Sequence, residues 1–329
     1  MSLASSGAEA NSFDVLTMGR VGVDVYPQQI GVGLEDVTSF AKYLGGSAGN
    51  VAVAAARHGR RVALVSGVGT DPFGRFVRRA LRGFGVDDAF VVDVDDLPTP
   101  VTFCEIFPPD HFPIYFYRRP SAPDLQVRPE HLDADAVRRA GIFWATVTGL
   151  CQEPSRTTTL QALALRGRAD HTVLDLDWRP MFWESAQAAE PLIRAALDRA
   201  TVAVGNLDEC EVAVGERDPE RAAQRLRALG IRLAVVKLGG DGVFALDDSG
   251  AHHCPATPVE VVNGLGAGDA FGGALCHGLL AGWDTGRILR FANAAGAWVA
   301  ARLACADAMP TAAEVEDWLS SREPVMLRP

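Results

Sequence analysis

Residues 261–271 read Val261-Val262-Asn263-Gly264-Leu265-Gly266-Ala267-Gly268-Asp269-Ala270-Phe271, and the fold can be predicted outward from them. Two β-branched residues run into three glycines, and an apolar, helix-like run begins directly after Asp269. Glycines let successive backbone N–H groups point toward one position, and the positive end of a helix adds to their attraction for an anion. We interpret the stretch as an anion-binding turn with Asp269 as a proton acceptor beside it. The alternative is a glycine-rich turn in which Asp269 is the helix N-cap.

The composition is that of a globular protein without a general affinity for polyanions. Apolar residues make up 48% of the 329 residues, and the formal net charge is −10. Such a chain lacks the basic surface that nucleic acid or an anionic membrane requires, so we expect no partner of either kind. No run of 18 apolar residues occurs, and Met1–Ser12 lacks the basic and apolar regions of a signal peptide. We interpret residues 1–12 as a disordered leader and expect a cytoplasmic protein.

A second glycine turn lies near the start of the chain. Gly45-Gly46-Ser47-Ala48-Gly49-Asn50 precedes an alanine-rich helix, and its small residues would let a ligand approach the backbone closely. Upstream, Phe13–Met18 is a predicted buried strand, and Asp24 is expected where the carboxyl end of this strand opens. Because that edge binds ligands in a doubly wound sheet, we expect Asp24 and Asn50 to lie at the mouth of the same ligand-binding cleft. The alternative for Asp24 is a turn aspartate.

Two segments interrupt the expected alternation of strands and helices. Thr99–Phe107 alternates in polarity, a Pro-Pro turn follows, and Pro113–Arg118 is an aromatic strand, which together predict a hairpin. We expect residues 99–120, with the irregular segment of about residues 25–44, to form a small β-sheet lid. Arg118 follows the aromatic strand and would meet an anionic substrate. The alternative is a solvent-facing arginine on an edge strand.

From Asp133 onward, strands and helices alternate regularly. Strands are predicted at 141–145, 171–176, 201–205 and 233–237, each preceded by a helical segment. This alternation indicates parallel strands with helices on both faces of the sheet. The expected fold class is therefore α/β: a Rossmann-type sandwich with a central, mostly parallel sheet, forming one domain over residues 13–329 with the inserted lid.

Several familiar binding motifs are missing. A Walker A loop needs Gly-Lys-Ser/Thr, and neither Lys42 nor Lys237 follows a glycine. The dinucleotide fingerprint G-x-G-x-x-G is absent after the first strand, and around Gly264 and Gly266 its third glycine is replaced by Asp269. The six cysteines are scattered without a C-x-x-C pair, so neither a zinc site of the usual spacing nor a dense disulfide framework is expected.

The two glycine turns resemble the two signatures of the PfkB family of carbohydrate kinases, whose fold is ribokinase-like. Residues 45–50 resemble the first signature and residues 264–269 the second, and the resemblance extends from Phe13 to Ser320. It implies a lidded α/β domain that transfers the γ-phosphate of ATP to a sugar hydroxyl with Mg²⁺ as cofactor. It does not decide whether a monovalent cation is a second cofactor. One departure is that Asn263-Gly264 stands where the family commonly has Asp-Thr.

The resemblance also implies roles for individual residues. Asp269 is the expected catalytic base, and the backbone of Gly266–Gly268 is the expected anion hole. Asn206 and Glu209 resemble the family's N-x-x-E element, in which Glu209 with Asn206 holds Mg²⁺ through water. The other implied nucleotide-binding residues are Lys237, Gly239, Gly242, Gly264 and Asn293, and the implied sugar ligands are Asp24, Gly45, Gly46 and Asn50.

The expected substrate is a small anionic sugar acid. Residues 18–27, 99–109 and 305–311 resemble family members of inositol catabolism, which phosphorylate 5-dehydro-2-deoxygluconate to its 6-phosphate. Arg20, Arg118 and Arg179 are expected near the mouth and suit bidentate recognition of a carboxylate. For Arg179 the alternative is an ion pair with Asp175 or Asp177.

Other functions and an assembly also stay open. The same chemistry could act on 2-dehydro-3-deoxygluconate or on a ketohexose such as fructose. A non-catalytic sugar- or nucleotide-binding regulator is favoured only by Asn263-Gly264, and a dehydrogenase is disfavoured by the missing fingerprint. The exposed strands of the lid could also pair between subunits and form a homodimer.

Overall fold

The computed structural model describes residues 12–322, so the leader predicted at residues 1–12 lies outside it except for Ser12. In that range the main sheet has ten strands, and in order across the sheet they are β14 (Gly250–Cys254), β13 (Val243–Asp247), β12 (Leu233–Lys237), β11 (Val202–Asn206), β10 (Thr172–Asp175), β9 (Ile142–Thr146), β1 (Val15–Met18), β4 (Val62–Gly69) and β5 (Val86–Asp87), with β6 (Val91–Val94) paired to β4. β1 pairs in parallel with β4 and β9, whereas β13 is antiparallel to both of its neighbours, β12 and β14. The central strands are mostly apolar and buried along their whole length because helices cover both faces.

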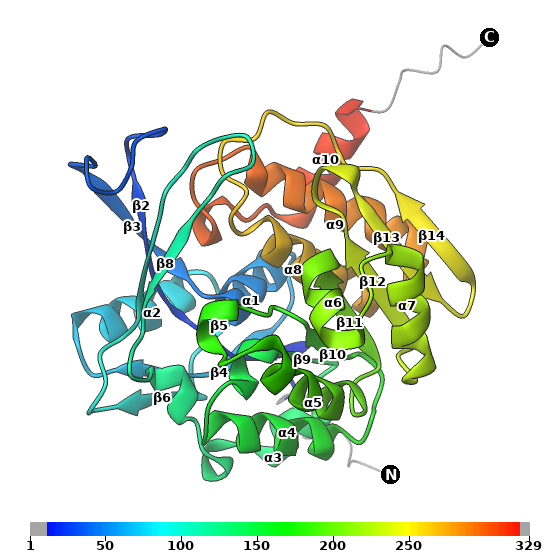
Figure 1. Cartoon of the computed structure of the whole chain (residues 1–329), viewed down its shortest axis with the longest axis horizontal. Helices are drawn as coiled ribbons and strands as arrows, with labels where there is room; N and C mark the ends of the chain where they lie inside the picture. The colour runs from blue at the N-terminus through cyan, green and yellow to red at the C-terminus, as the bar shows by residue number, and fades with distance from the viewer. Residues whose placement is uncertain (1–11, 323–329) are drawn as a thin grey trace, which may run out of the picture.

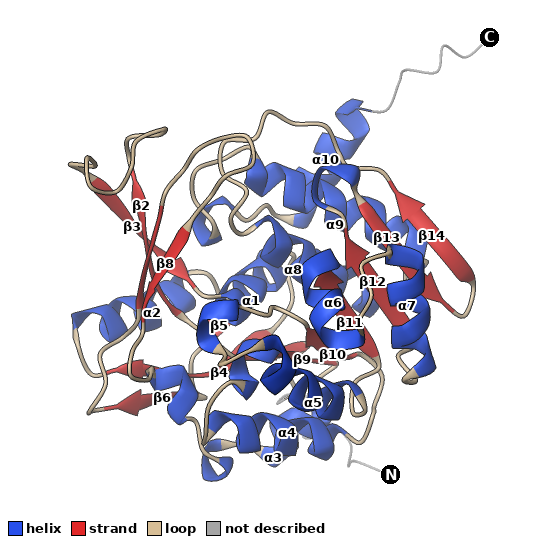
Figure 2. Cartoon of the chain, viewed as in Figure 1, coloured by secondary structure: helices blue, strands red, loops and turns tan. Residues whose placement is uncertain are grey.

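The helices lie in two layers, one on each face of the main sheet (Figures 1 and 2). One layer contains α1 (Ser47–Arg57), α2 (Pro72–Gly83), α8 (Ala267–Leu280), α9 (Thr285–Ala300) and α10 (Ala312–Arg322). The other contains α3 (Ala134–Arg139), α4 (Ser155–Arg166), α5 (Ala186–Leu197), α6 (Leu207–Val214) and α7 (Pro219–Ala228). Each layer buries its own hydrophobic core against the sheet. The predicted α/β sandwich is therefore confirmed.

A second, four-stranded sheet projects from the body and is the lid (Figure 2). Its strands, in order, are β3 (Phe40–Gly45), β2 (Gly22–Pro27), β7 (Val101–Cys104) and β8 (Ile114–Tyr117). β7 and β8 form the predicted antiparallel hairpin. The expected position of Asp24 was wrong: β1 ends at Met18, and Asp24 lies inside β2, in the lid instead of at the edge of the main sheet. The chain passes from one sheet to the other within a few residues, so Asp24 is carried past the strand end.

Helices α1 and α8 pack closely against each other, and this contact positions the site. A Cβ added at Gly273 would overlap Ala54, and one added at Gly272 would lie 2.8 Å from the ring of Trp144. Small residues let two helices approach closely, so the axes of α1 and α8 lie nearer than larger side chains would allow. As a result, the first turns of both helices, which contain the two glycine turns, lie beside each other.

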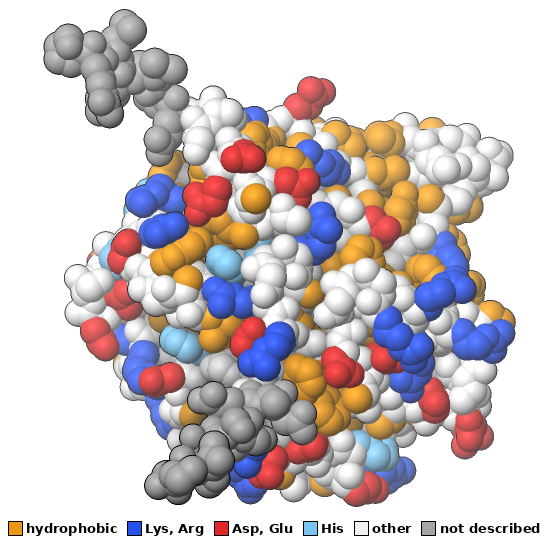
Figure 3. All heavy atoms as spheres, turned by 180° about the vertical axis from the view of Figure 1, so that it is seen from behind, with side chains coloured by type: hydrophobic (Ala, Val, Ile, Leu, Met, Phe, Trp, Pro, Cys, Tyr) orange, Lys and Arg blue, Asp and Glu red, His pale blue; other side chains and the backbone are white. Residues whose placement is uncertain are grey.

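The surface carries mixed charge. On the face seen in Figure 3, basic and acidic side chains are interspersed with apolar and neutral ones. Between residues 12 and 322, no helix has both the length and the apolar character needed to cross a membrane.

The far end of α1 contains a buried histidine without hydrogen-bond partners. His58 is 4% exposed, and neither of its ring nitrogens is hydrogen-bonded in the described chain. Its ring packs against those of His277 and Phe291. Burial, reinforced by His277 and Arg60, lowers the pKa of His58 to about 3.

Acid should therefore destabilise the fold through His58. The unfolded chain takes up a proton at this side chain near pH 6.5, whereas the folded chain does so only near pH 3, so stability falls as the pH drops through that window. Between pH 7.5 and 5.5 this one group should remove about 1.4 kcal/mol of stability. His58→Phe keeps a ring beside Phe291 and should lack that loss. Urea unfolding at both pH values measures the difference, and equal losses in the two proteins would contradict the assignment.

Candidate active site

The first turn of α8 has free backbone N–H groups and no side-chain cap. Its N-cap is Gly266, in the left-handed conformation with φ of 81°. A Cβ at this position would lie 2.6 Å from Sγ of Cys305, so only glycine fits both the backbone and the space. Asp269 is not the N-cap, which was the alternative interpretation, but lies inside the first turn. The N–H groups of this turn therefore stay available to an anion.

Two side chains of α1 hold the carboxylate of Asp269. Ser47 Oγ donates a hydrogen bond to Oδ1 at 3.1 Å, and Asn50 Nδ2 donates one to Oδ2 at 2.8 Å. Burial raises the pKa of Asp269 above its usual range, while the hydrogen bond from Asn50 opposes that rise. A held carboxylate with a raised pKa is suited to accept a proton. Sequence reasoning missed Ser47, although it stands in the first glycine turn, and it assigned Asn50 to the sugar when its amide contacts Asp269.

A pocket under the lid, the lid pocket, collects several of the predicted sugar ligands. Its lining comprises Arg20, Asp24, Tyr26, Gly46, Ser47, Asn50, Thr102, Cys104, Ile114, Phe116, Arg179, Leu265, Gly266, Asp269 and Cys305. Gly45 does not line it, but a Cβ there would overlap the carboxylate of Asp24, so this glycine makes room for the acid. Burial raises the pKa of Asp24 to about 6, against the opposing effect of Arg20. Near neutral pH Asp24 is therefore mostly a charged acceptor on the lid, and the carboxyl group of Asp269 on α8 lines the same pocket.

Arg20 and Arg179 share one counter-ion in the lid pocket. Arg179 lies 2.6 Å from Oδ1 of Asp177, and Arg20 lies 3.9 Å from its Oδ2. The Nε atoms of both arginines are buried without hydrogen-bond partners among the described residues. Both interpretations of Arg179 therefore hold in part, since it lines the pocket and is ion-paired. Two guanidinium groups therefore reach this pocket, which they share with the carboxylates of Asp24 and Asp269.

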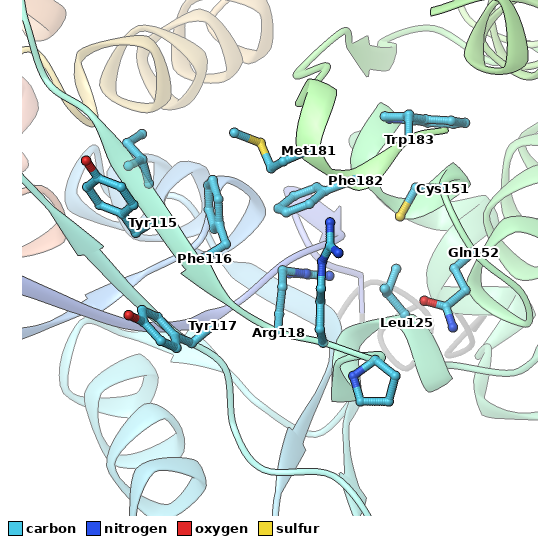
Figure 4. Close-up of a pocket in the computed structure, with 13 residues that line it drawn as sticks. Tyr115, Phe116, Tyr117, Arg118, Leu125, Cys151, Gln152, Met181, Phe182 and Trp183 are labelled. Carbon is cyan, nitrogen blue, oxygen red and sulfur yellow. The ribbon is translucent and has the colours of Figure 1, made fainter. Parts of the chain in front are cut away.

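Arg118 lies outside the lid pocket. It lines a neighbouring hollow of about 930 Å³, and Figure 4 shows Phe182 and Trp183 among the other residues that line it. Its guanidinium bonds Asp124 at 2.9 Å and lies 4.6 Å from the ring centroid of Phe182. Ile114 and Phe116, on one face of β8, line the lid pocket, and alternation alone would place Arg118 on the same face. The strand ends at Tyr117, so Arg118 does not continue that face. The structure therefore does not support Arg118 as a ligand of this pocket.

A second cavity, the edge cavity, lies on the other side of the α8 turn. Its volume is about 470 Å³, and the predicted nucleotide residues that line it are Lys237, Gly239, Gly242, Gly264 and Asn293, together with Ala267 and Gly268. A Cβ at Gly242 would overlap the carbonyl of Cys254, so the turn after β12 requires this glycine. Asn293 donates a hydrogen bond to the carbonyl of Pro255 at 2.8 Å. Apolar residues of α8 and α9 themselves complete the wall.

Asn206 and Glu209 do not line the edge cavity. They form a reciprocal capping box at the start of α6: Asn206 Oδ1 accepts from the N–H of Glu209 at 2.9 Å, and Glu209 Oε2 accepts from the N–H of Asn206 at 2.8 Å. Glu209 makes this capping contact through Oε2 alone. Among residues 12–322, no group of three or more His, Cys, Asp or Glu side chains is placed to hold a metal ion by itself.

Buried charges of both signs surround the α8 turn. Burial raises the pKa of Asp175 to about 7, although Lys237 opposes the rise. Burial would lower the pKa of Lys237, but Asp175 and Glu209 outweigh it and hold that pKa above its usual range. A Cβ at Gly268 would lie 3.4 Å from Nζ of Lys237, so this ammonium lies beside the turn. An additional positive charge thus reinforces the helix end where an anion would bind.

Asn263 and Gly264 each make close contacts with neighbouring segments of the chain. Asn263 is fully buried, donates to the carbonyl of Leu303 at 2.7 Å and accepts from the N–H of Leu265 at 3.0 Å. A Cβ at Gly264 would lie 2.9 Å from Cε2 of Phe112, in the lid hairpin. Phe112 therefore occupies the space that the family's threonine side chain would need.

A helix N-terminus with a held carboxylate between two cavities, beneath a β lid, defines a small-molecule kinase of ribokinase-like architecture. The family model described as pfkB family carbohydrate kinase matches residues 13–312. The chain therefore belongs to the PfkB family of carbohydrate kinases, as its two glycine turns predicted.

Individual relatives agree with this assignment. The 5-dehydro-2-deoxygluconokinase of Shouchella clausii is 33% identical over 313 residues, which cover 94% of this chain and 96% of that protein. The crystal structure of a PfkB protein from Polaromonas sp. JS666 has a TM-score of 0.80 and 27% identity, covering 92% of this chain and 99% of that one. Aminoimidazole riboside kinase from Salmonella enterica, solved with aminoimidazole riboside and an ATP analog, has a TM-score of 0.77 and 27% identity. The match covers 94% of this chain and 100% of that one.

The contact between Phe112 and Gly264 can be tested with a double-mutant cycle. Gly264→Thr restores the family's residue but should force the Phe112 ring aside, lowering thermal stability and raising the KM for ATP. Phe112→Ala in the same chain removes the collision, so the double variant should lose less than the sum of the two single losses. We expect a coupling free energy of about 0.5–3 kcal/mol from chemical unfolding. Strict additivity would show that the two residues do not compete for space.

Proposed function

We propose that this kinase phosphorylates a hydroxyl of a small sugar acid with ATP, and that its substrate is 5-dehydro-2-deoxygluconate, converted to the 6-phosphate. One observation supports the chemistry best: successive residues of a single helical turn face two different cavities. Gly266 and Asp269 line the lid pocket, whereas Ala267 and Gly268 line the edge cavity. A sugar in the first and a nucleotide in the second would meet at this turn.

The proposed reaction follows from that arrangement. The sugar hydroxyl gives its proton to the carboxylate of Asp269 as its oxygen forms a bond to the γ-phosphorus, and the bond from phosphorus to ADP breaks. The N–H groups at the start of α8 and the ammonium of Lys237 stabilise the charge that spreads over the phosphoryl oxygens. Ser47 and Asn50 keep the accepting carboxylate in place through their hydrogen bonds.

The carboxylates that could hold Mg²⁺ with a nucleotide interact with Lys237, which itself lines the edge cavity. This ion prefers one or two carboxylates with water and phosphate oxygens over a cage made entirely of protein groups. Asp175 is a buried carboxylate, and Glu209 uses Oε2 for the capping hydrogen bond, so its other oxygen could face a hydrated cation. Glu209 with Asn206 would hold the ion through water, where it would neutralise phosphate charge.

The choice of an acidic substrate rests on Arg20 and Arg179. Their guanidinium groups suit bidentate recognition of a substrate carboxylate, a group that a neutral hexose lacks. The relatives named 5-dehydro-2-deoxygluconokinase support the same choice. The ion pair between Arg179 and Asp177 already neutralises part of this charge, which keeps 2-dehydro-3-deoxygluconate and a fructokinase-type reaction as second candidates.

The lid supports a homodimer as the proposed assembly of this cytoplasmic enzyme. The lid face opposite the pocket carries Phe40, Tyr115 and Tyr117, whose exposed fractions are 39%, 44% and 68%. Large aromatic side chains in contact on one exposed sheet face favour association with another surface. A second copy of the same lid would cover them.

Removing the base should abolish turnover but not nucleotide binding. Asp269→Ala is expected to lower kcat by orders of magnitude, because the attacking hydroxyl loses its proton acceptor. Titration calorimetry should find ATP affinity within a few-fold of wild type. Asp284→Ala is the matched control, since Asp284 caps the start of α9 away from both cavities. Near-wild-type turnover of Asp269→Ala would exclude it as the base.

Substrate class is tested by ADP release across 5-dehydro-2-deoxygluconate, 2-dehydro-3-deoxygluconate, fructose and ribose. The first should give the highest kcat/KM, and absence of ADP release with all four would favour a regulator. Arg20→Met and Arg179→Met should each raise the KM for the acid by about 10- to 100-fold, because a hydrogen bond between charged groups is lost. Arg119→Met is the control on the lid. A wild-type preference for either neutral sugar would contradict the role of the arginines.

A further inference from the structure

Tyr26 is a buried phenol in the lid pocket that has no part in the phosphoryl transfer described above. It stands on β2, two residues after Asp24, and is 1% exposed. Its hydroxyl donates a hydrogen bond to Oδ2 of Asp24 at 3.0 Å. The hydroxyl oxygen of Tyr26 also lies 2.6 Å from Sγ of Cys305. A phenol has one proton, and Asp24 accepts it, so the thiol of Cys305 is the donor in the second contact.

Cys305 connects Tyr26 to the anion-binding turn. Burial raises the pKa of Cys305 well above its usual range, so this thiol carries the proton that it donates. Its sulfur fills the space that a side chain at Gly266 would need. The contacts therefore run from Asp24 on the lid, through Tyr26 and Cys305, to the N-cap of α8.

Several groups besides Tyr26 act on the carboxylate of Asp24. Arg20 attracts the carboxylate, Asp269 repels it, and Thr102 offers a further hydrogen bond from β7. Tyr43 stands opposite on β3, and Cys104 and Cys305 lie on β7 and after α9. Of these groups in the described chain, the hydroxyl of Tyr26 is the one that donates a direct hydrogen bond to the Asp24 carboxylate, at 3.0 Å.

We propose that Tyr26 is a positioning residue for sugar recognition: through its hydroxyl it orients the carboxylate of Asp24 toward the sugar hydroxyls and ties the lid to the α8 turn through Cys305. The inference rests on the proposed function, because it takes Asp24 as a sugar ligand. It concerns binding of the sugar and leaves the proton transfer to Asp269.

Tyr26→Phe removes the hydroxyl and keeps the ring. Losing one hydrogen bond that fixes a ligand should raise the KM for the sugar about tenfold, whereas kcat and the KM for ATP stay within about twofold. A hydrogen bond to the ionised form lowers a carboxyl pKa, so its loss should raise the pKa of Asp24. The acidic limb of kcat/KM for the sugar should then move to higher pH, while the acidic limb of kcat stays in place.

Tyr43→Phe is the matched control, because the two tyrosine rings are 5.5 Å apart and Tyr43 makes no hydrogen bond in the described chain. It should leave both limbs and both KM values unchanged. Both variants are assayed with whichever sugar of the panel the wild type turns over best, so a wrong substrate assignment leaves this test intact. Circular dichroism melting checks the fold of Tyr26→Phe. An unshifted kcat/KM limb with unchanged KM, or an equal fall in kcat, would overturn the proposal.

Discussion

The close packing of α1 on α8 is the contact on which the rest of the site depends. Gly273 and Ala54 let the two helices approach, and the first turns of both then face each other. Asp269 comes from one helix and its two hydrogen-bond donors, Ser47 and Asn50, from the other. A carboxylate held from a second element cannot rotate away without losing both donors. The anion-binding N–H groups and the proton acceptor are thus fixed in one rigid unit.

Burial of charge is the second constraint. Asp24, Asp175 and Asp269 all have raised pKa values because the protein removes water from them, and Arg20, Arg179 and Lys237 only partly compensate. Carboxylates of this kind are costly in an empty protein. They become favourable when a sugar hydroxyl, a magnesium ion or a proton arrives. The arrangement costs folding free energy that is recovered when ligands bind.

The sequence predicted the architecture and the centre of the site but not its outer parts. Glycine turns and strand–helix alternation were sufficient because both are local patterns that follow from what the backbone needs. Such patterns can be recognised in one sequence without knowing which distant residues meet. Side-chain direction was harder: Arg118 and Arg20 are both arginines after strand-like segments, yet only Arg20 lines the lid pocket. Ser47 was overlooked because its partner lies 222 residues away. Asp24 was misplaced because one turn separates two sheets, a topology that periodicity does not reveal.

The two sheets divide the recognition of the ligands between them. Asp24, Thr102 and Phe116 reach the lid pocket from the four-stranded sheet, whereas the residues of the edge cavity come mostly from the main body. Substitutions in the lid can therefore alter the accepted sugar while the phosphate-handling turn stays intact. A family that keeps one reaction and acts on many sugars is the expected product of that separation.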